Sequence, residues 1–91
     1  MVNFALLLGR NVAAARERAG LSQEDLWFRS SVHRTAVSKI ERGETIPRSD
    51  TLLKLAGALG VGTDDLMAGL SWQPGEWQHG RLEGPGDDAT L

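Results

Sequence analysis

The sequence predicts an all-α fold, a compact bundle of five short helices followed by an irregular C-terminal tail. Apolar residues recur at three- and four-residue steps through residues 4–70, a spacing that places them on one face of a helix. Residues that cap or break helices separate these stretches, and no stretch alternates polar and apolar residues as a strand does. A chain of 91 residues is long enough for one small domain.

The first helix is expected to follow Asn3, a residue type that favours the N-cap position. It runs to about Ala19, and Gly20 ends it from a position where a left-handed backbone is common. Its apolar stripe, which we expect to face the core, comprises Phe4, Leu7, Leu8, Val12, Ala15 and Ala19.

The second and third helices are short and closely spaced. Ser22 is expected to cap the second helix, with Asp25 three residues later in an arrangement close to a capping box, and this helix runs to about Ser30. The third begins near residue 33 or 34 and stops at Gly43, with two residues turned toward the core: Val37 and Ile40.

The fourth and fifth helices follow a loop that contains Pro47, which blocks continuation of the third. Ser49 and Asp50 restart the helical pattern. A wide apolar face predicts that the fourth helix is the central core element: Leu52, Leu53, Leu55, Ala56 and Leu59. After the break at 60–62, Thr63 is expected to cap the fifth helix, whose first turn carries Asp64 and Asp65.

The composition changes after Leu70, where Gly and Pro become frequent and the pattern fits neither helix nor strand. We therefore expect a domain over 1–70 and a tail over 71–91. Trp72 and Trp77 are costly to leave in water, so at least one is expected to dock. It would dock on the fourth and fifth helices, on a second copy of the chain or on another protein.

The charge is unevenly divided along the chain, although the net charge is only −2. Residues 1–48 contain eight Lys or Arg and five Asp or Glu, which gives a net charge of +3. Residues 49–91 contain two Lys or Arg and seven Asp or Glu, which gives a net charge of −5. A basic face can attract phosphate even when the whole chain is acidic. The alternative is an ordinary solvated surface.

Other chemistry finds little support in the sequence. The chain has no cysteine, no leader-like segment and no apolar run that could span a membrane. Its two histidines, His33 and His79, have no carboxylate or thiol at ligand spacing, so we expect no metal and no cofactor. No grouping of nucleophile and base has supporting context, so we expect no enzyme.

Three segments together resemble the Xre/Cro type of lambda-repressor-like helix-turn-helix domain: Leu21–Leu26, Val32–Gly43 and Leu52–Val61. The resemblance covers about residues 4–70, and its most specific motifs are the Ser-Gln-Glu start of the second helix and the Ile-Glu-Arg-Gly stop of the third. It implies a helix-turn-helix within the bundle, with the third helix in the DNA major groove and the second across the backbone.

Carried onto this chain, the resemblance implies two sets of DNA contacts. The base-edge readers would be Arg34, Thr35 and Lys39, flanked by His33 and Ser38. The phosphate contacts would be Ser22, Gln23, Arg42 and Arg48. The resemblance also implies a partly buried ion pair between Arg16 and Glu41, which we interpret as a fold-specifying contact.

The chain departs from the family pattern at three positions. Trp27 stands where a small residue is usual, Ser30 replaces an apolar residue, and Ser31 replaces the turn glycine. A serine in the left-handed conformation that glycine tolerates would carry strain. Trp27 is expected to pack into the core beside the small Ala36, although Trp27 and Phe28 together would also suit a partner protein.

The function predicted from these observations is sequence-specific binding of double-stranded DNA by a cytoplasmic transcription regulator of bacterial or phage origin, acting as a repressor. A homodimer would read an inverted repeat. Its dimer or partner surface would comprise Val61, Leu66, Met67, Leu70, Trp72 and Trp77. The alternative is a protein-interaction module, such as an antitoxin or adaptor, that works through Trp27 and Phe28 or through the tail.

Overall fold

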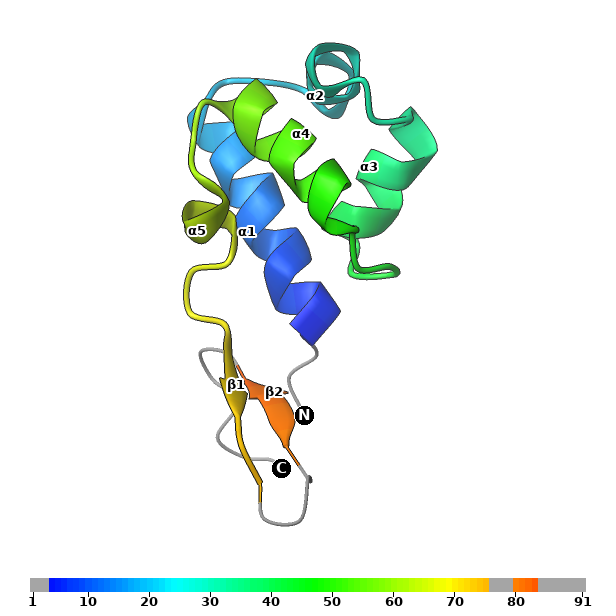
Figure 1. Cartoon of the computed structure of the whole chain (residues 1–91). Helices are drawn as coiled ribbons and strands as arrows, with labels where there is room; N and C mark the ends of the chain where they lie inside the picture. Colours follow the sequence, from blue (N-terminus) through cyan, green and yellow to red (C-terminus); the bar gives the residue numbers. More distant parts are fainter. Residues whose placement is uncertain (1–3, 76–79, 84–91) are drawn as a thin grey trace.

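The computed structural model describes residues 4–75 and 80–83, and it confirms the predicted helical bundle (Figure 1). The five helices are α1 (Phe4–Arg18), α2 (Gln23–Ser30), α3 (Arg34–Glu41), α4 (Ser49–Leu59) and α5 (Thr63–Leu66). Two short strands follow, β1 (Ser71–Gln73) and β2 (Arg81–Glu83). In Figure 1 the strands extend from the helical body, which gives the molecule an elongated shape of 43 × 22 × 22 Å.

The core lies between the five helices. α1 packs against α3, α4 and α5, while α2 packs against α3 and α4. Every helix therefore supplies residues to one continuous apolar cluster: Leu8, Val12, Ala15, Leu26, Val32, Val37, Ile40, Leu55, Ala56, Leu59 and Leu66. Burial of this cluster is the main stabilising term for a domain of this size.

Two residues of the predicted apolar faces are exposed to solvent. Leu53 is 63 % exposed, because the buried face of α4 is set by Leu55, Ala56 and Leu59 and a residue two positions before Leu55 points to the opposite side. Ala19 is exposed because α1 ends one residue earlier, at Arg18. The prediction that both face the core was wrong.

The helix starts follow the predicted chemistry, with one shift. The amide of Asp25 donates to Ser22 Oγ at 3.0 Å and the amide of Ser22 donates to Asp25 Oδ2 at 2.9 Å, which confirms the capping box. The hydrogen bond from the Ser22 backbone lowers the pKa of the Asp25 carboxyl. At α5 the N-cap is Gly62, not Thr63, and its amide donates to Asp65 Oδ2 at 3.0 Å.

α1 approaches the end of α3 closely at two glycines. A Cβ on Gly9 would overlap the carbonyl oxygen of Ile40 and lie 2.9 Å from that of Glu41. Gly43 has a φ of +74°, and a Cβ there would lie 2.7 Å from Leu6 Cα. Only glycine allows backbones this close, so both positions fix how α3 sits on α1.

The two strands correct the prediction that the tail contains none. β1 and β2 pair antiparallel, with Trp72 opposite Leu82. The Trp72 ring lies over Gly80, where it would overlap any added Cβ, and the residue is still 58 % exposed. Strands of three residues are too short to show an alternating pattern, which is why the sequence did not reveal them.

Candidate nucleic-acid interface

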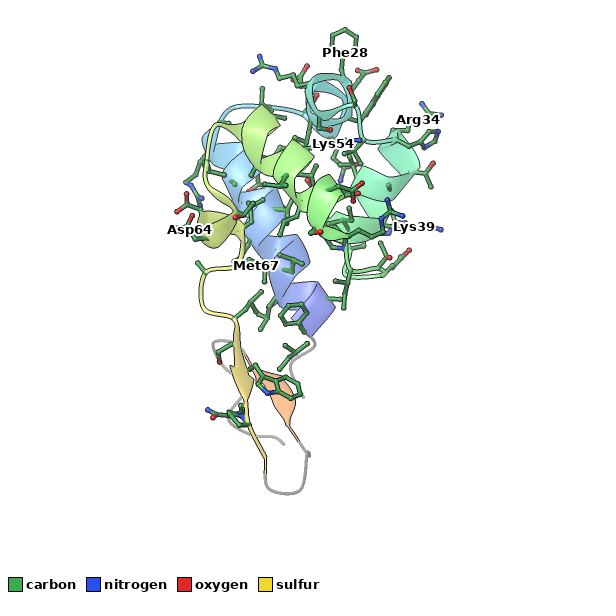
Figure 2. The ribbon with its side chains drawn as sticks, viewed as in Figure 1. Phe28, Arg34, Lys39, Lys54, Asp64 and Met67 are labelled. Atoms are coloured by element: carbon green, nitrogen blue, oxygen red, sulfur yellow. The ribbon has the colours of Figure 1, made fainter. Side chains whose placement is uncertain are left out.

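α3 carries the exposed polar face that the sequence predicted for it. Its inner side holds the buried Val37 and Ile40. Arg34, Thr35 and Lys39 are exposed on the outer side, and Thr35 and Lys39 share one face because they are four residues apart. In Figure 2 the labelled Arg34 and Lys39 both project from α3 away from the bundle. The helix thus presents two cations on a rigid, polar surface.

These two cations are free of hydrogen bonds and ion pairs to other residues within 4–75 and 80–83. Three other arginines in the same range form ion pairs: Arg16, Arg42 and Arg48. Arg34 and Lys39 therefore remain available to an external acceptor. The planar fork of Arg and the point charge of Lys both suit the O6 and N7 acceptors of guanine.

The start of α3 is capped by an imidazole. His33 Nδ1 accepts a hydrogen bond from the amide of Thr35 at 3.1 Å, which satisfies one of the free donors at this helix end. His33 is itself exposed. Because Nδ1 is the acceptor, Nε2 carries the proton of the neutral ring and is left for a contact outside the helix.

A shallow groove of about 410 Å³ lies between α2 and α3 and gathers most of the predicted site residues. Its lining also includes two residues that the sequence did not suggest for the site, Glu24 and Trp27. The full lining is Gln23, Glu24, Trp27, Arg34, Thr35, Ser38 and Arg42. Residues of both α2 and α3 therefore line this solvent-exposed groove.

The predicted phosphate contacts on α2 are engaged within the protein. Ser22 Oγ is the acceptor of the capping box. Gln23 Nε2 donates to Glu41 Oε1 at 2.8 Å, which ties the first turn of α2 to the last residue of α3. Both residues are nonetheless exposed at the start of α2.

Arg16 and Glu41 form the ion pair that the resemblance implied. Arg16 Nε lies 2.7 Å from Glu41 Oε2, and Nη2 lies 3.1 Å from Oε1, so the pair is bidentate. The side chains are only 15 % and 5 % exposed. Arg16 Nη1 also donates to the carbonyl of Leu21 at 2.9 Å, so the pair joins α1, the α1–α2 turn and α3. The hydrogen bond to Glu41 raises the pKa of the Arg16 guanidinium.

The two loop arginines are exposed but already carry partners. Arg42 Nε donates to Glu44 Oε2 at 2.8 Å, and Arg48 Nη2 donates to Asp50 Oδ2 at 3.1 Å. These hydrogen bonds lower the pKa of the Glu44 and Asp50 carboxyls. Ser38 Oγ accepts a further hydrogen bond from Arg42 Nη1. The sequence analysis did not identify these pairs.

The turn between α2 and α3 explains two of the unusual residues. Ser31 has a φ of 62° and a ψ of 19°, the left-handed conformation expected for a turn glycine. Ser30 is buried, and its Oγ accepts a hydrogen bond from the amide of Val32 at 3.1 Å. A buried polar side chain needs such a partner, so Ser30 is compatible with the core.

Ser31→Gly is expected to stabilise the domain by about 1 kcal/mol, since glycine adopts the left-handed conformation without the penalty that a Cβ carries. The melting temperature should rise by several degrees in a chain of this size. Ser31→Ala is the matched control, because it removes the hydroxyl and keeps the Cβ. A Ser31→Gly melting temperature no higher than that of Ser31→Ala would show that the turn is unstrained.

Trp27 and Phe28 differ in burial. Trp27 is half-buried and packs against the core cluster, as does Ala36. Phe28 is 76 % exposed and meets the Trp27 ring edge-on, at 6.3 Å between ring centroids. A second groove of about 570 Å³ runs beside them, lined by Trp27, Phe28, Ser31, Val32, His33 and Arg34.

One residue of the predicted dimer or partner surface is not at the surface. Leu66 is fully buried in the core, because α5 packs its single turn against α1 and α4. Three others are half-buried against the same cluster: Val61, Met67 and Leu70. Trp72 is largely exposed, and Trp77 lies outside the described residues.

The described part of the chain contains neither a cluster of metal ligands nor a membrane-spanning helix. No three His, Asp or Glu side chains there gather in a way that could hold a metal ion. No helix in those residues has the length and apolar character needed to cross a membrane.

Two short helices across a tight turn, the second presenting unpaired cations, define the class of helix-turn-helix DNA-binding domains. A family model described as helix-turn-helix matches residues 12–66. The chain belongs to this helix-turn-helix family, of the Xre/Cro or lambda-repressor-like type. It is 41 % identical over 66 residues to control protein C.BamHI of Bacillus amyloliquefaciens, covering 71 % of this chain and 82 % of that protein.

Solved structures show the same fold. The restriction-modification controller protein C.AhdI of Aeromonas hydrophila is 35 % identical, with a TM-score of 0.66 over 68 % of this chain and 94 % of C.AhdI. The P22 c2 repressor, solved in complex with a synthetic operator, is 34 % identical with a TM-score of 0.62 over the same shares of the two chains. Both similarities cover most of the helical body.

Proposed function

We propose that this chain regulates transcription by binding a specific double-stranded DNA sequence, with α3 in the major groove. The observation that carries the proposal is the outer surface of α3, where Arg34 and Lys39 are exposed and form no hydrogen bond or ion pair within residues 4–75 and 80–83. The similarity to a repressor solved with a synthetic operator, to control protein C.BamHI and to the restriction-modification controller protein C.AhdI supports this function. The protein-interaction alternative has no comparable support.

Each residue of the interface has a proposed role. Arg34 and Lys39 donate to guanine O6 and N7, and Thr35 contacts a thymine methyl. His33 and Ser38 flank these contacts, His33 through Nε2. The start of α2 binds phosphate through its backbone amides, Ser22 and Gln23, while Arg42 and Arg48 reach phosphates beside the groove.

The proposed assembly is a homodimer that reads an inverted repeat, with half-sites about one DNA turn apart. The half-buried Val61, Met67 and Leu70 offer apolar surface for the dimer, together with the exposed Trp72. Such a dimer would repress by occluding a promoter in a bacterial or phage-infected cytoplasm. We further propose that residues 1–70 form the DNA-binding domain and that 71–91 are an accessory segment.

Selection of bound duplexes from a random DNA pool tests the function directly. We expect enrichment of one palindromic sequence, and binding that weakens steeply as salt rises because phosphate contacts release counterions. Size measurement of the selected complex gives the number of chains per duplex. A pool that stays unenriched at low salt, or binding that is insensitive to salt, would contradict a sequence-specific regulator.

A further inference from the structure

Arg42 and Arg48 each hold a carboxylate two residues later in the chain. Arg42 Nε and Nη2 donate to Glu44 Oε2 and Oε1 at 2.8 and 3.1 Å. Arg48 Nε and Nη2 donate to Asp50 Oδ1 and Oδ2 at 3.3 and 3.1 Å. In both pairs one edge of the guanidinium donates hydrogen bonds to both carboxylate oxygens, and arginine binds a phosphate group with the same bidentate geometry.

The site therefore contains two kinds of cation. Arg34 and Lys39, on the face of α3, have no hydrogen-bonding partner within 4–75 and 80–83. The loop arginines are held by carboxylates, and Arg42 is held additionally by Ser38 Oγ. The field of Glu44 also reaches Lys39, which makes a smaller contribution than Arg42 to the lowered pKa of Glu44. The groups expected to read bases are free, and those expected to bind phosphate are occupied.

We propose that Glu44 and Asp50 compete with DNA phosphate for Arg42 and Arg48, and that they thereby limit the affinity of the protein for DNA and its salt dependence. This inference rests on the proposed function. The Nε–Nη2 edge of a guanidinium accommodates one anion at a time. A phosphate must therefore displace the carboxylate or approach a pair that has no net charge.

The exposure of both pairs makes this exchange feasible without unfolding. The side chains of Arg42 and Glu44 are 54 % and 50 % exposed, and those of Arg48 and Asp50 are 83 % and 55 % exposed. Ion pairs this exposed are weak, so the carboxylates hinder phosphate binding without preventing it. The expected consequence is weaker binding to any duplex, with base reading by Arg34 and Lys39 left intact.

The test compares Glu44→Gln and Asp50→Asn with Asp64→Asn. The first two remove one negative charge each and keep the size and an acceptor oxygen. Asp64 lies on α5, on the other side of α1 from α3 in Figure 2, so its change controls for net charge alone. Binding to a duplex of arbitrary sequence is measured over a series of salt concentrations, after melting curves have shown that each variant is folded.

Glu44→Gln and Asp50→Asn should each bind about two- to fivefold more tightly than wild type at about 50 mM salt. The slope of log K against log salt should steepen by up to about 0.9 for each, as expected when one more phosphate is neutralised. Asp64→Asn should leave the slope unchanged.

Two results separate this inference from the function on which it rests. In the first, wild type binds duplex, but Glu44→Gln and Asp50→Asn have the same affinity and salt slope as Asp64→Asn, or bind more weakly. Glu44 and Asp50 then do not compete with phosphate, and the inference is overturned while the proposed function stands. If wild type binds no duplex at any salt concentration, the proposed function fails and the inference falls with it.

Discussion

Replacing both Arg34 and Lys39 with alanine is expected to lower affinity for the selected duplex by about 10²- to 10⁴-fold, since each bidentate base contact contributes about 1–3 kcal/mol of discrimination. Affinity for arbitrary DNA should fall much less, because the phosphate contacts remain. The melting temperature should stay close to that of wild type, since both side chains are exposed and make no hydrogen bond in the described structure. Binding isotherms for both kinds of duplex measure the two effects.

The matched control removes two other cations, Arg10 and Arg18, which are exposed on α1. This variant has the same net charge as the α3 variant, so it reveals how much of any loss is a general electrostatic effect. We expect it to keep the selected sequence preference. If the α3 variant and this control lost affinity equally on both duplexes, α3 would not be the helix that reads the bases.

Glu41→Ala is expected to destabilise the domain by about 3 kcal/mol or more, because it strands the Arg16 guanidinium in a mostly buried position. It also removes the acceptor for Gln23, which links α2 to α3. In a domain of this size such a loss lowers the melting temperature by well over about 10 °C. Thermal or urea unfolding of the purified variant measures it.

Glu44→Ala is the control for this prediction, since it breaks an exposed pair and should leave the melting temperature close to that of wild type. Combining Glu41→Leu with Arg16→Met should recover part of the lost stability, because no buried charge is then left unpaired. An unchanged melting temperature for Glu41→Ala would show that the Arg16–Glu41 contact does not stabilise the fold.

The helices were predictable from the sequence because residues at or next to each helix end determine where that helix begins and ends. Ser22 and Asp25 cap α2 through their own side chains, and Gly60 ends α4 in a left-handed conformation that glycine adopts readily. The strained turn at Ser31 was also predictable, because the family pattern places a glycine there. Each of these features depends on a few neighbouring residues.

Features that depend on tertiary packing were harder to predict. Periodicity marked Leu53 as core, and the family resemblance placed Leu66 on a dimer surface. The packing of α4 and α5 reversed both. Gly9 had no local signal, since its role comes from a backbone 31 residues further on, at Ile40. The pairs of Arg42 with Glu44 and Arg48 with Asp50 depend on loop conformations that residue spacing does not reveal.

The contact between α1 and the end of α3 has a thermodynamic consequence for recognition. At Gly9 and Gly43 one backbone rests directly on another, so no flexible side chain lies between them that could let α3 rock or slide. If α3 is the recognition helix, as we propose, these contacts preorganise it, and we expect it to bind DNA in the pose that it has in the free protein. Little ordering of the protein backbone should oppose binding, and the conformational entropy lost on complex formation should come mainly from exposed side chains and from the DNA.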